Sequence, residues 1–527
     1  MSTKSTAEDC PIIALDRFIQ ATRDSGYKGT ASAVSELIDN SLQAGASEIQ
    51  ILLAEVGGEF PVEVRVVDNG CGMDPFTLRQ ALRFGGSSRF GDRSGLGRYG
   101  MGLPNSSLSQ AVRVTVYTWR TLDDRPNVRK GKRAAPDEVY SSYLDVDEIA
   151  SGTLSQVPVP HKTQQIPPHC VGKSGTLVHW ERCDRLDNRR ISTLAKKLSI
   201  ELGRRFRHFI WNGVRIQVNG EPVRAIDPLF LRGDRAGAEL FGEELTYEIA
   251  IDPSDKSKGT SVVRVRFSEL PVHEWQALSN DEKRDQGISK GAGVSIVRAG
   301  REVDYGWFFI EKRRENYDDW WRCEVRFEPA LDEAFGITHT KQQIRPRPHL
   351  ADVLTPDIEE TARILNGRAR KAHLDTKAQE RFGDVEKLAG ERDRRMAPLP
   401  SKGDSGAQKL LGELKKKTPA LRAKKQTSGT GYKIVERPLD TMEFYRPVYD
   451  GERLVLVINP EHSFYKRLYG PLVDSDKADD KALRERLALF LLAAARAEVA
   501  LGGARNRDAI QKFRNEWSNT LATLLDV

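Results

Sequence analysis

The sequence has no long apolar stretch and few cysteines. Its longest uninterrupted apolar run, Leu487–Ala495, is roughly half of what a bilayer-spanning helix needs, so we expect no transmembrane helix. Residues 1–5 contain no apolar signal core. The five cysteines are scattered and include no CxxC pair, which is typical of free thiols in a reducing compartment. These absences favour a cytoplasmic protein without a membrane segment.

The positive charge of the chain is concentrated in one segment. The 527 residues carry a formal net charge of +7. Residues 392–425 contain 11 Lys and Arg against 3 Asp and Glu, a local excess of +8, which is larger than the net charge of the whole chain. A basic segment is able to hold phosphates. A solvated linker has the same composition, and the sequence leaves both interpretations open.

Hydrophobic periodicity predicts alternating helices and strands over most of the chain. Residues 397–432 are rich in Pro, Gly, Ser and Lys, which is typical of a mobile tether. The predicted helices are 11–25, 29–44, 75–84, a helix from about Leu103, 189–206, 356–395, 480–500 and 507–525. The predicted strands are 48–54, 62–68, 111–119, 138–146, 175–181, the hairpin 215–223, 244–250, 261–268, 292–298, 322–328 and 453–458.

Three short motifs occur in order between residues 31 and 102. In the first, Glu36 and Asn40 are four residues apart on a predicted helix, so they project from the same face. In the second, Asp68–Gly72, an aspartate at a strand end is followed by two glycines. The third, Gly95–Gly102, is rich in glycine and precedes a helix. Their order and spacing together indicate one nucleotide site.

The residue types suit the chemistry of nucleotide hydrolysis. Cleavage of a phosphoanhydride needs a metal to neutralise charge, donors around the phosphates and a base to orient water. Asn40 offers a neutral oxygen ligand for Mg²⁺. Glu36 is able to accept a proton from the attacking water. Asp68 is able to accept a hydrogen bond from an exocyclic amine such as that of adenine.

The glycines suit close approach to a ligand. Gly70 and Gly72 let the base of a nucleotide come near the backbone. The third motif leaves backbone N–H groups free to point at phosphates just before a helix N-terminus. Its glycines are Gly95, Gly97, Gly100 and Gly102.

Each motif taken alone has a structural explanation. A Glu–Asn pair is usually a solvated helix edge, and an Asp-Asn-Gly sequence is usually a turn. The glycine motif suggests a dinucleotide fold, but a polar loop rather than a strand precedes it. Gly172–Ser174 resembles the end of a P-loop, yet Pro167 stands where that motif requires its first glycine.

Together the motifs resemble the N-box, the D-x-G-x-G box and the glycine-rich lid of the GHKL ATPases. This superfamily includes gyrase B, the ninety-kilodalton heat-shock chaperones, sensor histidine kinases and MutL. Residues 36–42 and 68–73 are most similar to the MutL and MORC branches. The resemblance covers roughly residues 30–225. It implies an α+β Bergerat fold, a mixed sheet with helices on one face and ATP held beneath a movable lid.

The resemblance assigns roles by position. Glu36 would be the general base, Asn40 the Mg²⁺ ligand and Asp68 the acceptor of the adenine amine. Thr176, after Gly175, matches the fourth box, where a Thr supports the adenine and Asp68. One departure is Gln43, where many relatives have an Asp. The resemblance also places in the nucleotide site Gly70, Gly72, Met73, Gly95, Gly97, Gly100, Met101 and Gly102.

The rest of the chain extends the resemblance into a second domain. Asn219–Gly220 and Val297–Val303 look like the joint and the S5-like α+β transducer domain of the MutL, topoisomerase and MORC group. A transducer Lys reaches the γ-phosphate there, and Lys341 is the candidate in this chain. His462, near the end of the chain, is interpreted as structural. The expected domains are 1–225 (ATP binding), 226–352 (transducer), 353–435 (helical and basic linker) and 436–527 (a small α+β domain of unknown role).

The resemblance implies an ATP-gated homodimeric clamp, with DNA held through residues 392–425. The alternative is a chaperone-like ATPase that acts on protein clients. A histidine kinase is disfavoured because no His precedes residue 161. We recognise no nuclease metal cluster and no topoisomerase tyrosine motif, so a partner effector subunit would have to supply any DNA cleavage.

Overall fold

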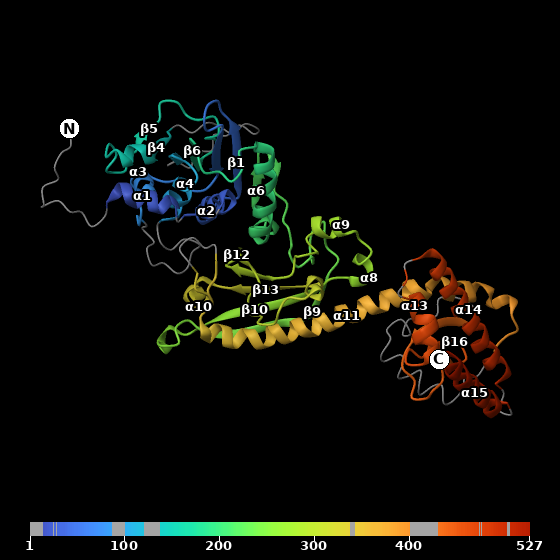
Figure 1. Cartoon of the computed structure of the whole chain (residues 1–527). Coiled ribbons are helices and arrows are strands. Elements are labelled where there is room, and N and C mark those ends of the chain that lie inside the picture. Colours follow the sequence, from blue (N-terminus) through green and yellow to red (C-terminus); the bar gives the residue numbers. More distant parts are fainter. Residues whose placement is uncertain are drawn as a thin grey trace. The chain divides into compact units, whose positions relative to one another are not determined.

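The computed structural model describes residues 14–24, 26–27, 29–86, 101–120, 138–337, 343–400, 430–473, 475, 477–502 and 506–526. The chain folds into two compact units (Figure 1). The first consists of Met1–Pro271 and Leu278–Asn366, and the second of Val272–Ala277 and Gly367–Val527. Among the described residues, no helix combines the length and the apolar character needed to cross a bilayer.

The first unit begins with an eight-stranded mixed sheet of order β5-β4-β3-β6-β2-β1-β7-β8. Neighbouring strands are antiparallel except β1 and β7, which are parallel. The strands are β1 Glu48–Glu55, β2 Val62–Asp68, β3 Arg113–Arg120, β4 Tyr140–Asp145, β5 His161–Lys162, β6 Ser174–Glu181, β7 Arg215–Val218 and β8 Glu221–Pro222.

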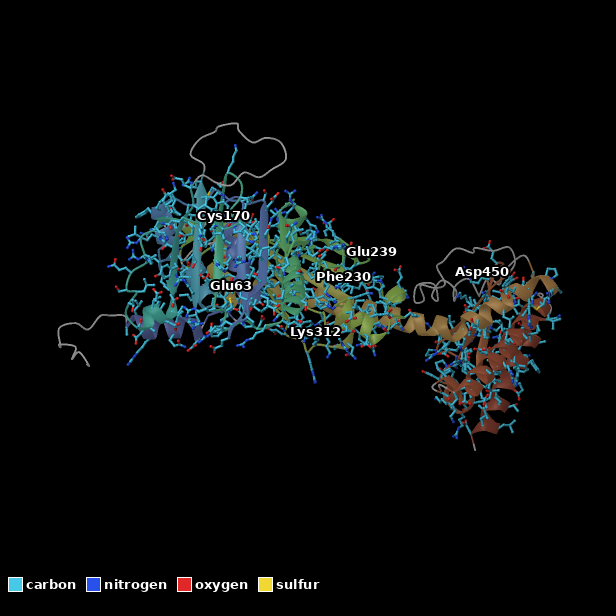
Figure 2. The ribbon with its side chains drawn as sticks, turned by 90° about the horizontal axis from the view of Figure 1, so that it is seen from above. Glu63, Cys170, Phe230, Glu239, Lys312 and Asp450 are labelled. Carbon is cyan, nitrogen blue, oxygen red and sulfur yellow. The ribbon has the colours of Figure 1, made fainter. Side chains whose placement is uncertain are left out.

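Helices cover one face of this sheet (Figure 1). Successive strand residues point to opposite faces. Val64 and Val66 therefore enter the core shared with the helices, whereas Val67 joins a small cluster on the other face with Trp119 and Cys170, the last labelled in Figure 2. The helices are α1 Leu15–Asp24, α2 Thr30–Gln43, α3 Pro75–Leu82, α4 Gly102–Leu108, α5 Val146–Ala150, α6 Ile191–Arg205 and α7 Arg207–Trp211.

A second, five-stranded sheet follows in the order β12-β11-β13-β10-β9. Leu350, Leu354 and Ile358 recur every turn on α11 (Pro348–Arg392) and pack on the apolar face of this sheet. The strands are β9 Glu239–Ala250, β10 Thr260–Glu269, β11 Val294–Arg298, β12 Arg301–Gly306 and β13 Trp321–Phe327. The short helices are η1 Lys256–Lys258, α9 Asn280–Asp285, η2 Asn316–Trp320, η3 Pro329–Leu331 and α10 Asp332–Phe335.

The second unit is built on a three-stranded sheet of order β14-β16-β15. Both ring nitrogens of His462 are hydrogen-bonded to main-chain groups, with Ser518 O at 3.1 Å and Phe464 N at 3.0 Å. Its strands are β14 Gly431–Glu436, β15 Tyr445–Tyr449 and β16 Arg453–Ile458. Its helices are α8 Val272–Trp275, the later part of α11, η4 Asp393–Arg395, η6 Tyr465–Tyr469, α13 Gly470–Val473, α14 Ala478–Leu501 and α15 Arg507–Leu525.

The α+β fold class is confirmed, with a mixed sheet and helices on one face. The pattern missed α5 and α7, since five residues are too few to show a helical period. It also missed β12, β14 and β15 and placed the start of α11 at Pro356, which the structure shows inside the helix. A proline usually interrupts a helix, but helix α11 begins at Pro348 and continues through Pro356. β14 lies inside the segment expected to be linker.

Candidate active site

Helix α2 carries the two polar residues of the first motif. Its apolar side, which includes Val34, Leu37 and Ile38, is buried against the sheet. The helix ends before Gly45, whose φ of +75° favours glycine. Glu36 is only 3% exposed although it is a carboxylate. A carboxylate is rarely so buried without partners, so its surroundings are informative.

Two residues define the surroundings of Glu36. Tyr27, just before α2, makes a side-chain hydrogen bond to Glu36, and burial followed by the charge of Glu36 raises the pKa of Tyr27 well above its usual range. Gly102, the first residue of α4, lies so close that a Cβ there would be 2.3 Å from Glu36 Oε1. The third motif therefore ends directly against the proposed base, and a larger residue at that position would displace the Glu36 carboxylate.

Asn40 lies one turn further along α2 and is partly exposed. Among the residues that the structure describes, the Asn40 side-chain amide has no hydrogen-bond partner, so the amide oxygen is available to a ligand. Ser41 follows it and is 3% exposed. The Ser41 hydroxyl donates to Asp68 Oδ2 at 2.9 Å, which ties α2 to the end of β2. Sequence reasoning missed Ser41, because a Ser in a helix carries no distinctive signal.

Asp68 is held as an acceptor at the end of β2. Its Oδ1 accepts the Gly70 N–H at 2.8 Å, and the main chain of Thr176 also bonds to the carboxylate. Burial raises the pKa of Asp68 above its usual value, and the bonds from Gly70, Ser41 and Thr176 oppose that rise. These donors stabilise the charged form that accepts a hydrogen bond from an amine. Thr176 and Asp68 are also partners in the β2–β6 register.

The glycines of the second motif allow close packing. At Gly72 φ is +66°, and a Cβ there would be 2.2 Å from the main-chain oxygen of Trp119. At Gly70 a Cβ would be 2.8 Å from Ala44 Cβ and 2.9 Å from Asp68 Oδ1. Both positions therefore exclude any side chain.

Thr118 connects this loop to the neighbouring strands. Its hydroxyl accepts the Met73 N–H at 2.7 Å and donates to Gly175 O at 3.2 Å. Thr118 is fully buried in β3. Sequence reasoning missed it, because only the register of β3 against β6 brings it to the Asp68 loop.

Part of the predicted site lies outside the described residues. Met101 and Gly102 are described, and α4 begins at Gly102 as expected for a helix after the third motif. The contacts predicted for the others with phosphates remain predictions. The residues outside the described ranges are Gly95, Gly97, Gly100 and Lys341.

The side chains around Asn40 suit a magnesium ion better than a metal that needs three or more protein ligands. Within the described ranges, no group of three His, Cys, Asp or Glu stands close enough to hold a metal. Mg²⁺ takes one or two protein oxygens and completes its shell with water and phosphates. Asn40, with its amide oxygen available, meets that requirement.

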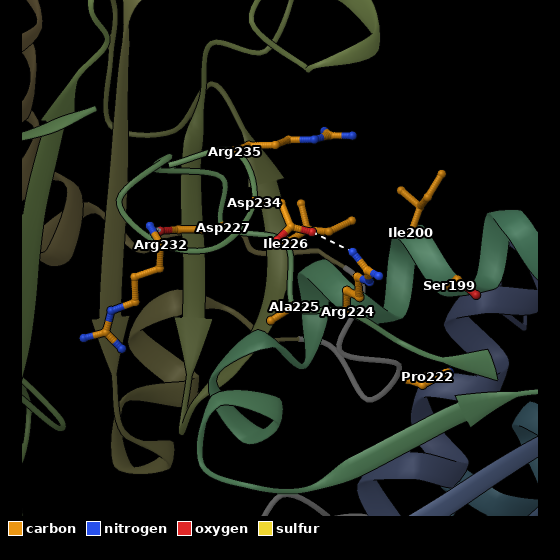
Figure 3. A pocket seen from close by; sticks show the side chains of 10 residues that line it. All are labelled: Ser199, Ile200, Pro222, Arg224, Ala225, Ile226, Asp227, Arg232, Asp234 and Arg235. Atoms are coloured by element: carbon orange, nitrogen blue, oxygen red, sulfur yellow. Dashed lines mark hydrogen bonds and ion pairs between the residues drawn. The ribbon is translucent and has the colours of Figure 1, made fainter. Parts of the chain in front are cut away.

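Two cavities in the first unit are lined by neither Glu36, Asn40 nor Asp68, although Met101 of the predicted site lines one of them. One of about 950 Å³ has an apolar wall that includes Phe18, Phe76 and Met101, but neither Asn40 nor Asp68. Another of about 310 Å³ is shown in Figure 3; there Arg224 donates to Asp234 at 2.8 Å.

Comparisons with known proteins find a family match over part of the chain. Residues 27–136 match the model of a family described as histidine kinase-, DNA gyrase B-, and HSP90-like ATPase. The DNA mismatch repair protein MutL of Leuconostoc citreum is 35% identical over 97 residues, 17% of this chain and 14% of that protein. MutL of Sinorhizobium medicae is 39% identical over 138 residues, 24% and 22%.

A plant protein is also similar. Protein MICRORCHIDIA 6 of Arabidopsis thaliana is 26% identical over 166 residues, 30% of this chain and 24% of that protein. The alignments thus cover 14–24% of the lengths of these three relatives.

Two solved structures are similar to part of the chain. The N-terminal domain of a DNA repair protein has a TM-score of 0.40 and 15% identity, covering 66% of this chain and 97% of that one. The B-subunit of DNA gyrase from Myxococcus xanthus has a TM-score of 0.31 and 12% identity, covering 63% and 88%.

Proposed function

We propose that residues 27–136, which match the model of the histidine kinase-, gyrase B- and HSP90-like ATPase family, belong to an ATPase domain, and that the chain hydrolyses ATP to open and close a homodimeric clamp on DNA. The observation that carries the ATPase proposal is the hydrogen bond from Ser41 to Asp68. It connects helix α2, which holds Glu36 and Asn40, to the end of strand β2, where Asp68 would bind the adenine. This bond supports the assignment of the proposed hydrolytic residues and the proposed adenine-binding residue to one site.

Each residue has a distinct task in this proposal. Glu36 accepts a proton from the attacking water, and Tyr27 orients its carboxylate through their hydrogen bond. Asp68 accepts a hydrogen bond from the adenine amine. Asn40 would hold Mg²⁺, which neutralises phosphate charge when bound. Lys341 would contact the γ-phosphate.

A change at Glu36 tests the ATPase. Glu36→Gln keeps the size of the side chain and removes the base, so kcat falls by about 10²- to 10⁴-fold while ATP still binds. The matched control is Glu59→Gln, because Glu59 is an exposed glutamate in the loop between β1 and β2. Steady-state ATPase assays with ATP-binding titrations measure both. Equal turnover of wild type and Glu36→Gln would remove Glu36 as the base.

The basic segment supports DNA as the substrate that the clamp holds. Several relatives are named as DNA mismatch repair proteins, and residues 392–425 carry the excess of positive charge. Deleting the whole segment would also remove Asp393, whose carboxylate contacts Thr430 and Tyr432. A sharper variant replaces five lysines with Gln and leaves Asp393 in place: Lys415, Lys416, Lys417, Lys424 and Lys425.

DNA binding and dimerisation are then measured separately. The five-Gln variant is expected to bind DNA more weakly and with a shallower salt dependence, while a five-Arg variant keeps both. Sedimentation is expected to show a monomer that becomes a dimer with a non-hydrolysable ATP analogue. A wild-type protein that binds no DNA at low salt would favour protein clients instead. A sedimentation coefficient unchanged by the analogue would contradict the clamp.

A further inference from the structure

The β11–β12 hairpin reaches the ATPase domain from the second sheet. Arg298 pairs with Arg301, which leaves Ala299 and Gly300 as a two-residue turn. Their φ values of +46° and +82° are those of a tight hairpin turn with both central residues left-handed. A Cβ on Gly300 would lie 3.5 Å from the ring of Phe209 on α7, so the turn is in van der Waals contact with that helix.

This turn delivers Arg301 to the helix of the candidate active site. Arg301 Nη1 lies 3.0 Å from Asp39 Oδ2 on α2. The two side chains are 3% and 0% exposed, so the ion pair is excluded from water. The guanidinium also lies 5.8 Å from the centre of the Phe206 ring, which limits its movement on one side. A buried pair of this kind strongly constrains both partners, because separating them leaves a charge without solvent.

Asp39 occupies a decisive place on α2. It lies between Glu36 and Asn40, the proposed base and the proposed Mg²⁺ ligand. Glu36, Asp39 and Arg301 all lie close enough to Tyr27 to influence its ionisation. Any shift of Asp39 would therefore move the two residues on which hydrolysis depends.

The hairpin does not need Arg301 to hold the two domains together. The next residue, Glu302, already accepts hydrogen bonds or ion pairs from Arg207 at 2.9 Å and Arg204 at 2.7 Å. Glu324 on β13 accepts a second bond from Arg207 at 2.5 Å. Other ion pairs thus join the two domains, and the ion pair of Arg301 is made with α2.

We propose that Arg301 is a positioning residue. Its ion pair with Asp39 holds α2 in the position that hydrolysis requires, so turnover depends on the contact between the second sheet and the ATPase domain. The inference rests on the proposed function, since it takes Glu36 and Asn40 as the working residues. Arg301 touches neither ATP nor the reacting atoms in this proposal.

The test compares Arg301→Gln with Lys312→Gln. Lys312, labelled in Figure 2, forms another buried pair in the same unit, with Asp318 at 2.7 Å and side chains 8% and 0% exposed. It contacts no residue of α2 in the described structure. Arg301→Gln should lower kcat by about 10- to 100-fold, with KM and Kd for ATP within about threefold. Lys312→Gln should leave kcat within about threefold.

A second readout needs no activity. Hydrogen exchange of the α2 amides, measured without nucleotide, should become faster in Arg301→Gln and stay unchanged in Lys312→Gln. Arg301→Lys, which keeps the charge, should recover part of kcat and of the amide protection. It also carries the comparison if Arg301→Gln does not fold.

The outcomes separate this inference from the proposed function. Unchanged kcat and unchanged α2 exchange in Arg301→Gln overturn the positioning role, as does an equal loss in Lys312→Gln. If wild type hydrolyses no ATP, or if Glu36→Gln is as fast as wild type, the proposed function fails. The α2 exchange in Arg301→Gln then still decides whether Arg301 holds the helix.

Discussion

At strands β11 and β13 the second sheet is buried on both faces, but in opposite ways. On β13, Trp321, Cys323 and Val325 point into an apolar core that α11 covers. The alternate residues Arg322 and Glu324 are 1% and 0% exposed and belong to a charged layer. Several partners in that layer come from α6 and α7 of the ATPase domain: Arg204, Arg207 and His208.

The difference lies in what each face is able to transmit. Apolar burial is non-directional, so small shifts across the α11 face change its free energy little. Buried ion pairs require particular partners at particular distances, and a lost partner leaves an uncompensated charge. The charged face is therefore the one suited to report the position of the second sheet to the ATPase domain.

The largest effect is expected at Arg207, which is fully buried and bonds to Glu302, Glu324 and Ser295. Arg207→Met removes a buried cationic partner from each of two carboxylates and should cost about 3–5 kcal/mol of unfolding free energy. Urea unfolding measures this. A loss under about 1 kcal/mol would show that the charged face adapts as easily as an apolar one.

A substitution on the apolar face should lower the free energy of unfolding somewhat less. Leu354 is fully buried against the sheet, so Leu354→Ala should cost about 2–5 kcal/mol through lost burial and a cavity. Its neighbour Val353 is 42% exposed, and Val353→Ala should stay within about 0.5 kcal/mol. The same urea series compares them. If Leu354→Ala lowers kcat as strongly as Arg301→Gln, the two faces do not differ in what they transmit.

The two faces should also differ in their response to pH. Burial raises the pKa of Glu324. The His208 hydrogen bond and the charges of Arg207 and Arg266 lower it by more, so the pKa lies well below its usual range. Glu324 therefore stabilises the fold above its unfolded-state pKa of about 4.3 and loses that contribution as the pH falls. The cost of Glu324→Gln should shrink between about pH 6 and pH 3. The cost of Leu354→Ala should not, and a parallel decline would contradict the assignment.

The smallest effect is expected where an ion pair is exposed. Arg224 and Asp234, beside the cavity of Figure 3, are 83% and 77% exposed. Arg224→Ala should change the unfolding free energy by less than about 1 kcal/mol, and salt should remove even that. Urea unfolding at low and high salt provides the measurement. A cost comparable to that of Arg207→Met would mean that burial does not set the strength of the charged face.

Much of the fold follows from local patterns. The predicted strands 48–54 and 62–68 correspond closely to β1 and β2, and the predicted helix 29–44 to α2. These elements show clear periods of two or of 3.6 residues. The pattern could not reveal that the polar face of β13 is buried, because Arg322 and Glu324 alternate with apolar residues as in a strand with one face in water. Only the tertiary structure shows that Glu324 is covered by α7, and Arg322 by the loop that contains Gly287 and Ile288.

The sequence by itself determined the identity of the chemical groups in the candidate site. Glu36, Asn40 and Asp68 follow from their order and spacing, because a helix turn and a strand end present side chains predictably. The tertiary structure decided which groups support them. Ser41, Thr118 and Arg301 reach the site through strand register and domain packing, and those bring together residues too far apart in sequence for any local pattern to connect.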